Sequence, residues 1–159
     1  MTTNVSPIPK GYHTATPYLI IRGAAQAIEY YQKAFGAREI TRMAGPDGKI
    51  MHAEIQIGDS MIMLADENPA WDVKSPQALG GSPVSVFLYV PDVDATFQQA
   101  VTHGATANMP VQDMFWGDRF GKLTDPFGHV WEVATHKEDL TLEEIMERSK
   151  KAMSQGAGA

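Results

Sequence analysis

The sequence predicts an α+β fold in which two tandem βαβββ modules form a cupped mixed sheet, followed by a C-terminal helix. An apolar stretch of strand length, an amphipathic helix and three further strand-like segments occur twice along the chain. The copies are in register, because Ser85 follows Thr16 by about 69 residues and Glu132 follows Met63 by the same offset. Such agreement indicates a duplicated supersecondary unit. The alternative is a single α+β domain whose halves are similar by accident.

Composition shifts along the chain divide it into five segments. Prolines mark the first segment as an arm, and three prolines with a Gly-Gly pair mark the third as a connection with no packed element. The expected segments are an N-terminal arm (1–12), the first module (13–66), a linker (67–83), the second module (84–136) and a C-terminal helix with a flexible tail (137–159).

In the first module, an apolar stretch from Thr16 predicts a strand, and residues 24–35 have the helical spacing of an amphipathic face. Gly36 is a typical C-cap residue, so the helix is expected to end there. Three strands separated by Gly-containing turns follow, over residues 40–43, 49–57 and 60–65.

The second module repeats this order with a strand over residues 85–90, a helix introduced by Pro91 and Asp92, and a glycine at 104 that closes it. Residues 126–134 form the counterpart of residues 57–65. After them, Thr141 and Glu144 have the spacing of a capping box, which predicts a peripheral amphipathic helix to about residue 153.

Composition limits the partners and the kinds of site. The formal net charge of -6 gives no electrostatic reason to expect nucleic acid or an anionic membrane as a partner. With no cysteine, disulfides and thiolate metal sites are excluded. No apolar run has the length of a membrane helix, and the first ten residues lack the apolar core of a signal peptide. We therefore expect a cytoplasmic protein.

Several short motifs carry a resemblance to a known family. The most specific are Trp-Gly-Asp-Arg at 116–119 and Asp-Pro-Phe-Gly-His at 125–129, and others lie at 16–20, 35–37, 51–55 and 57–60. Through them the chain resembles the vicinal oxygen chelate superfamily, which includes glyoxalase I, extradiol dioxygenases, fosfomycin-modifying enzymes and bleomycin-binding resistance proteins. Within it the chain is most similar to the PhnB-like, glyoxalase/bleomycin-resistance-like branch. The resemblance implies the glyoxalase/bleomycin resistance/dioxygenase fold.

The resemblance also implies where a metal would lie. In metal-dependent members, four ligands come from the first and last strands of the two modules, and here those positions carry Thr16, Met63, Ser85 and Glu132. Only Glu132 is a strong ligand for a hard or borderline divalent cation. We therefore expect no family metal and no cofactor, and a divalent metal belongs only to the alternative given below.

Strand alternation predicts which side chains line the cup. One face carries Tyr18, Phe87 and Met63 together with Thr16 and Ser85, and the helices cover the opposite face. Aromatic and thioether side chains suit a flat or amphipathic organic ligand. The alternative is that these side chains fill the cup themselves.

His52 and Glu54 stand two apart on a predicted strand, so both point to one face, while Met51 and Ala53 point to the other. With Glu132 they are the candidate catalytic residues, as an acid/base pair or as ligands of a rearranged metal site. A solvated or dimer-facing strand surface is the competing interpretation.

Trp116 and Arg119 are the remaining candidates for ligand binding. An indole stacks on flat ligands, and a guanidinium binds carboxylate or phosphate. In the competing interpretation, Asp118 and Arg119 fix the loop and Trp116 packs at a subunit interface. The segment 125–128 is expected to be only a tight turn.

These observations favour a metal-independent protein that binds a small molecule in the cup, and the resemblance and the aromatic loop 115–120 suggest a homodimer. One alternative is a metal-dependent lyase, isomerase or dioxygenase with a rearranged site at His52, Glu54 and Glu132. Another is a non-catalytic structural module with a filled cup. The usual hydrolase, kinase, dehydrogenase and zincin motifs are absent from the sequence.

Overall fold

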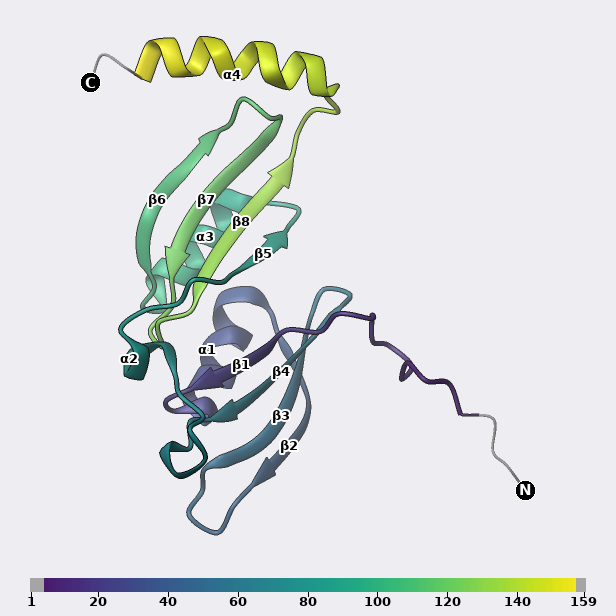
Figure 1. The fold of residues 1–159 in the computed structure, drawn as a ribbon, viewed down its shortest axis with the longest axis vertical. Helices are drawn as coiled ribbons and strands as arrows, with labels where there is room; N and C mark the ends of the chain where they lie inside the picture. Colours follow the sequence, from purple (N-terminus) through teal and green to yellow (C-terminus); the bar gives the residue numbers. More distant parts are fainter. Residues whose placement is uncertain (1–4, 157–159) are drawn as a thin grey trace. The chain divides into compact units, whose positions relative to one another are not determined.

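The computed structural model describes residues 5–156, and it confirms the α+β fold with two four-stranded mixed sheets (Figure 1). These residues divide into two compact units. The first takes 5–84 together with Pro126–His129, and the second takes Ser85–Asp125 together with 130–156. The start of the expected arm (1–4) and the end of the expected tail (157–159) lie outside the described residues.

The first unit contains one βαβββ module. Its elements are β1 (Tyr18–Ile21), α1 (Ala24–Phe35), β2 (Arg38–Ala44), β3 (Ile50–Ile57) and β4 (Ser60–Asp66). The sheet order is β1-β4-β3-β2, with β1 parallel to β4 and the other pairs antiparallel. β1 and β4, the first and last strands of the module, are therefore neighbours in the sheet, and their side chains lie next to each other.

α1 begins and ends where the local sequence predicts. Gly36 adopts a left-handed conformation with φ 65° and closes the helix, which lies on one face of the sheet (Figure 1). At the other end, Asp66 Oδ1 accepts hydrogen bonds from the backbone N–H groups of Gly23 and Ala24, each at 2.9 Å. A carboxylate at the end of β4 therefore caps α1 and ties the helix to the sheet.

The second unit repeats this plan. Its elements are β5 (Ser85–Tyr89), α3 (Val93–Thr102), β6 (Thr106–Asp113), β7 (Asp118–Thr124), β8 (Val130–His136) and α4 (Leu142–Gly156). The sheet order is β5-β8-β7-β6, again with its first and last strands parallel and adjacent. Asp92 caps the start of α3, because its side chain accepts a hydrogen bond from the N–H of Ala95 at 3.0 Å.

Alternation places the two cores as predicted. The helix-facing side chains of the closing strands are buried, with Leu64 in β4 and Trp131 and Val133 in β8 all fully covered. The opposite residues stay accessible, with Tyr18 47% and Phe87 41% exposed. Each sheet therefore has a packed face under its helix and an open face, and the open faces are where binding residues are expected.

The connection between the modules is more structured than expected. It contains the 3₁₀ helix η1 (Pro69–Trp71) and the short helix α2 (Pro76–Leu79). Proline stands at the start of both, where its missing N–H costs no helical hydrogen bond. The prediction of a connection with no packed element was wrong because Pro69 and Pro76 begin short helices.

The capping box at the C-terminal helix is confirmed. Glu144 accepts from the Thr141 N–H at 2.8 Å, and the Glu144 N–H donates to Thr141 Oγ1 at 3.3 Å. α4 extends to Gly156, three residues beyond the expected end. None of the helices within residues 5–156 has the length and apolarity needed to cross a lipid bilayer.

Candidate functional site

The open face of the first sheet carries the most concentrated set of candidate residues. β1 contributes Tyr18 and Ile20, and β4 contributes Met63 and Ala65 at paired positions. Glu54 of β3 pairs with Met63 on the other side. The pairing register therefore brings an aromatic ring, a thioether and a carboxylate onto neighbouring strands of one surface.

Tyr18, His52 and Glu54 form a hydrogen-bonded chain on this face. The Tyr18 hydroxyl lies 3.1 Å from His52 Nδ1, and His52 Nε2 lies 3.3 Å from Glu54 Oε1. All three groups are satisfied when Tyr18 donates to Nδ1 and the Nε2–H donates to the carboxylate. The His52 imidazole then accepts a hydrogen bond from the Tyr18 hydroxyl on one side and donates one to the Glu54 carboxylate on the other. This is the arrangement of a proton relay.

Tyr12 joins this chain from the N-terminal side. Its hydroxyl is buried beside Glu54 without reaching regular hydrogen-bond geometry, and burial together with that carboxylate raises the pKa of Tyr12 to about 12. The Tyr12 phenol in turn lowers the pKa of Glu54; burial opposes this shift, and His52 reinforces it. Glu54 is therefore kept as a carboxylate that can stabilise a protonated imidazole.

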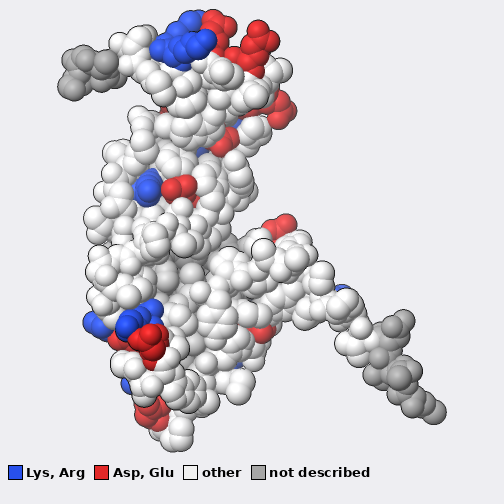
Figure 2. Space-filling model, in the orientation of Figure 1, with Lys and Arg blue, Asp and Glu red and all other residues white. Residues whose placement is uncertain are grey.

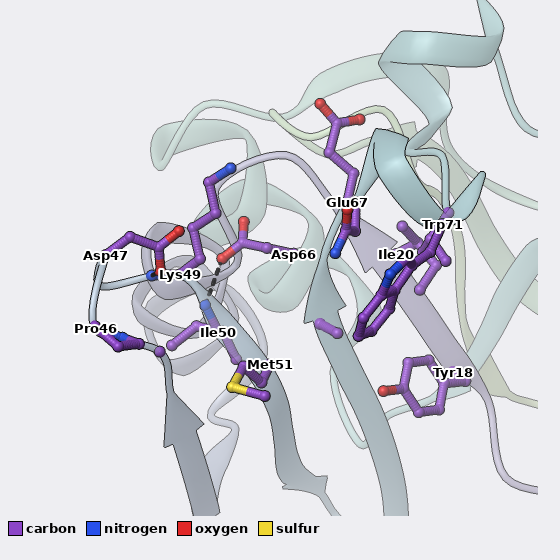
Figure 3. Close-up of a pocket in the computed structure, with 14 residues that line it drawn as sticks. Tyr18, Ile20, Pro46, Asp47, Lys49, Ile50, Met51, Asp66, Glu67 and Trp71 are labelled. Carbon is purple, nitrogen blue, oxygen red and sulfur yellow. Dashed lines mark hydrogen bonds between the residues drawn. The ribbon is translucent and has the colours of Figure 1, made fainter.

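A cavity of about 820 Å³ lies within the first unit and includes Tyr18 in its wall. Figure 3 shows the rings of Tyr18 and Trp71 on one side, with Pro46 and Asp47 on the other and Met51 between them. Trp71 is 77% exposed, which is unusual for so large an apolar side chain. The cavity thus offers an aromatic surface next to the hydroxyl that ends the relay.

The carboxylates of Asp66 and Glu67 at the cavity already have partners. Besides capping α1, Asp66 accepts from the Ile50 N–H through Oδ2 at 2.7 Å (Figure 3). Glu67 binds Arg22 Nε at 2.6 Å and accepts from Ser75, and these contacts lower its pKa to about 2. Both groups are therefore structural, and they hold the wall of the cavity in place.

Met51 reaches the cavity because the strand is irregular. Strict alternation from Ala53 would turn Met51 toward α1, yet it is 60% exposed. The β2–β3 register shifts between Met43 and Ala44, which leaves Met51 without a pairing position between His52 and Ile50. The prediction that Met51 shares a face with Ala53 was wrong, because a bulge reverses the alternation locally.

The four positions at which the resemblance implies metal ligands fall two to each unit. Thr16 precedes β1 and donates weakly to the His13 carbonyl at 3.5 Å, while Met63 lies on the open face of the first sheet. In the second unit Ser85 is exposed at the start of β5. Glu132 lies 3.5 Å from Lys122 Nζ and so has a cationic partner. Among residues 5–156 no group of three His, Asp or Glu side chains is arranged to hold a metal ion.

The open face of the second sheet carries an aromatic row. Phe87 stacks on Phe120 with ring centroids 5.8 Å apart and contacts Tyr89 at 5.0 Å, and Trp116 meets Phe120 edge-to-face at 5.7 Å. Phe120 is buried and Trp116 is half-buried. The loop that was expected to expose aromatics for a dimer thus packs largely on its own sheet.

Trp116 and Arg119 are both engaged by carboxylates. Asp118 is 4% exposed and accepts from Trp116 Nε1 and from the Tyr89 hydroxyl, both at 3.1 Å. Arg119 binds both oxygens of Asp94, at 2.7 and 2.8 Å, and Asp113 at 3.1 Å. These contacts fit the competing interpretation, in which Asp118 and Arg119 fix the loop. Ligand binding by Trp116 and Arg119 stays a prediction.

The Asp-Pro-Phe-Gly-His segment does more than turn the chain. Within the first unit Phe127 meets Tyr30 edge-to-face at 6.1 Å, and His129 Nε2 lies 3.0 Å from the carbonyl oxygen of Ile20. The segment 125–128 was expected to be only a tight turn. The contact of His129 with the last-but-one residue of β1 instead fixes the strand that carries Tyr18.

Sequence reasoning missed Tyr12, Lys49 and Trp71. Lys49 was expected at the start of a strand but lies in the turn before β3, and Trp71 lies in the linker, which periodicity does not place relative to a sheet. The available signal was the Asn68-Pro69 pair, because an N-cap followed by proline indicates a helical turn that presents Trp71 in a fixed position.

Comparison with known proteins gives a consistent result. The family model of the Glyoxalase/Bleomycin resistance protein/Dioxygenase superfamily matches residues 12–133. The Mycobacterium bovis protein Mb0911c is 41% identical over 148 residues, which cover 91% of this chain and 93% of that protein.

Solved structures agree in fold. Protein PA1353 from Pseudomonas aeruginosa is 27% identical with a TM-score of 0.64, and the match covers 79% of this chain and 99% of that one. The PhnB protein from Bacillus cereus is 17% identical with a TM-score of 0.60, covering 77% and 99%. The second likeness concerns the fold alone.

Proposed function

The chain belongs to the Glyoxalase/Bleomycin resistance protein/Dioxygenase superfamily, and we propose that it binds a small organic molecule on the open face of its sheets without the metal of the metal-dependent members. The observation that carries this proposal is the cavity of about 820 Å³ in the first unit, with the exposed Trp71 in its wall. Its volume is in the range of cavities that take drug-sized ligands.

The lining of the cavity defines the kind of ligand. Tyr18, Met51 and Trp71 offer apolar surface that loses contact with water when a flat molecule covers it. Lys49 lies at the rim and takes part in no ion pair within the described chain, so its ammonium is available to a polar substituent. We therefore expect a ligand with an aromatic body and at least one oxygen acceptor.

The side chains at the inherited metal positions support the metal-independent part of the proposal. Thr16 and Ser85 offer only neutral hydroxyls and Met63 a thioether, and none of these is a strong ligand of Mg²⁺, Mn²⁺ or Zn²⁺. Glu132 would first have to give up its contact with the Lys122 ammonium before it could bind a metal ion.

A ligand-detected NMR screen tests the proposal. A set of aromatic carboxylates, phenols and ketones is screened against the wild-type protein in EDTA, and each hit is titrated against Trp71→Ala. Because Trp71 is exposed, its replacement leaves folding intact, and we expect affinity to fall by about tenfold, or ~1.4 kcal/mol.

Leu79→Ala is the matched control, because Leu79 is 64% exposed in the same linker but does not line the cavity. Hits should bind this variant as they bind wild type. A screen that finds no ligand, or ligands that bind Trp71→Ala unchanged, contradicts the proposed site.

A second candidate function is proton-transfer catalysis, and the chain of Tyr18, His52 and Glu54 favours it. A proton removed from a ligand carbon would pass to the Tyr18 oxygen as the Tyr18 proton moves to His52 Nδ1, and Glu54 would stabilise the imidazolium. Returning the proton to another atom of the ligand completes an isomerisation.

Deuterium exchange separates this enzyme from a simple binder. Ketone hits with a C–H group beside the carbonyl are incubated in D2O with wild type, His52→Gln or Tyr18→Phe, and loss of that proton signal is followed. An enzyme accelerates exchange in the wild type alone, whereas exchange at the buffer rate in all three rejects catalysis and leaves binding untouched.

A further inference from the structure

α4 carries an apolar stripe with no cover in the described chain. Leu142, Met146, Ser149 and Met153 follow one another at helical spacing, and the three apolar members are 73%, 54% and 71% exposed. The helix has no extensive packing contact with another helix or strand within residues 5–156. A lone helix of 15 residues is only marginally stable in water, so a partner for this stripe would stabilise it.

The charges beside the stripe are divided along the helix. Glu143, Glu144 and Glu147 come first along the helix, and Arg148, Lys150 and Lys151 follow them. Figure 2 shows acidic side chains gathered toward one end of α4 and basic ones toward the other. Acid near the helix start and base after it also suit the helix dipole.

Two of these charges flank the stripe on the same side and have no ionic partner. Glu143 and Lys150 are seven residues apart, about two helical turns, so they lie on one edge of the helix. Within the described chain neither takes part in an ion pair, whereas Arg148 binds Glu138 at 2.7 Å and Lys151 binds Glu147 at 2.9 Å.

We propose that the stripe of α4 is an interface with a second copy of this chain, in which two α4 helices pack antiparallel about a twofold axis. Antiparallel packing lays the acidic segment of one helix along the basic segment of the other. Glu143 then faces Lys150 of the partner subunit, and symmetry repeats this pair at the other end. A parallel arrangement would instead lay the acidic segments of the two helices side by side, with their helix dipoles aligned, and is disfavoured.

Leu142 of one helix then fits between Ser149 and Met153 of the partner subunit, and Met146 lies at the centre. Two helices of this length bury less area than a standard interface. We therefore expect weak association, with a dissociation constant on the order of 10 µM.

Sedimentation equilibrium of the full-length protein tests the interface directly. Wild type should change from monomer to dimer as its concentration rises, and Met146→Glu should raise the dissociation constant at least tenfold by placing a carboxylate at the centre of the stripe. Met146 is largely exposed, so the variant folds, which circular dichroism verifies.

Charge reversal tests the antiparallel orientation. Glu143→Lys and Lys150→Glu should each raise the dissociation constant several-fold, and the double variant should recover most of the loss because it restores opposite charges. Lys151→Glu is the matched control, since it makes the same charge change one residue further, on the side of the helix away from the stripe.

A monomer at all concentrations overturns the proposal. So does a dimer that withstands Met146→Glu, or a double variant that is weaker than either single one. Binding of α4 to phosphatidylcholine and phosphatidylserine vesicles by a chain that remains monomeric would assign the stripe to a membrane surface and equally reject the pairing.

Discussion

At the scale of residues, His52 is held from both sides, by the Tyr18 hydroxyl at 3.1 Å and by Glu54 at 3.3 Å. Tyr18→Phe removes one of these partners and leaves the ring in place. We expect nitrogen NMR of the wild type to show neutral His52 protonated at Nε2 and the variant to populate both tautomers. The free energy of unfolding should fall by about 1 kcal/mol.

Tyr89→Phe provides the control for this experiment. Tyr89 also donates its hydroxyl across an open sheet face, to Asp118 at 3.1 Å in the second unit. Its removal should cost a similar free energy of unfolding and leave the His52 tautomer unchanged. An unaltered His52 spectrum in Tyr18→Phe would contradict the relay.

The sequence predicted this site in part. That His52 and Glu54 share a face follows from the two-residue period of a strand, which needs no tertiary information. Tyr18 was predicted on a lining face, but its contact with His52 depends on the parallel pairing of β1 with β4, which pattern alone does not set. Tyr12 escaped prediction because a proline-rich arm has no period.

At the scale of elements, one carboxylate, that of Glu67, fastens the start of the linker to the first sheet and to Ser75. Glu67 binds Arg22 and Ser75, its side chain is 16% exposed, and its pKa lies near 2, below the ordinary 4.5. A depressed carboxyl pKa stabilises the fold fully above about pH 4.5, and this stabilisation is lost as the pH falls toward 2.

Glu67→Gln should therefore lower the free energy of unfolding by about 1–2 kcal/mol at pH 7. The difference from wild type should shrink between pH 4.5 and pH 2, because wild-type Glu67 then becomes protonated as well. Urea unfolding at pH 7, pH 5 and pH 3.5 measures it. Glu29→Gln, at an exposed position on α1, is the control; equal effects of the two variants would remove Glu67 from this role.

The loop before β7 depends on a glycine. Gly117 has φ 99°, and a Cβ there would lie 2.6 Å from the Glu138 carbonyl oxygen. Gly117→Ala should lower the free energy of unfolding by about 3 kcal/mol through strain and overlap. Gly48→Ala, at φ 78° with nothing nearby, should cost about 1 kcal/mol. Thermal unfolding measures the loss of stability in both variants. Similar losses would show that the overlap between the added Cβ and the Glu138 carbonyl oxygen is relieved, and would contradict this prediction.

Element boundaries were predictable where a strong period met a specific end signal. Residues 24–35 combine an amphipathic period with Gly36, and the helix spans those residues. The short helices of the linker are too brief to show a period, and the bulge at Met51 arises from pairing with β2. Both therefore depend on contacts that a single segment does not encode.

At the scale of the whole molecule, the duplicated plan was predictable because corresponding turns and strands recur at one offset. The repeat also located Glu132 and Met63 at equivalent sheet positions, and both lie on the open faces of their sheets. The Lys122 contact of Glu132 was not predictable, since it joins neighbouring strands whose register only the fold sets.

The most direct test of the account is calorimetric titration of the tightest aromatic ligand from the screen, in EDTA and then in Mn²⁺, with wild type and Trp71→Ala. A metal-independent site in the first unit predicts the same affinity in both buffers and a roughly tenfold loss in the variant. Binding that requires Mn²⁺ and ignores the loss of Trp71 would contradict it.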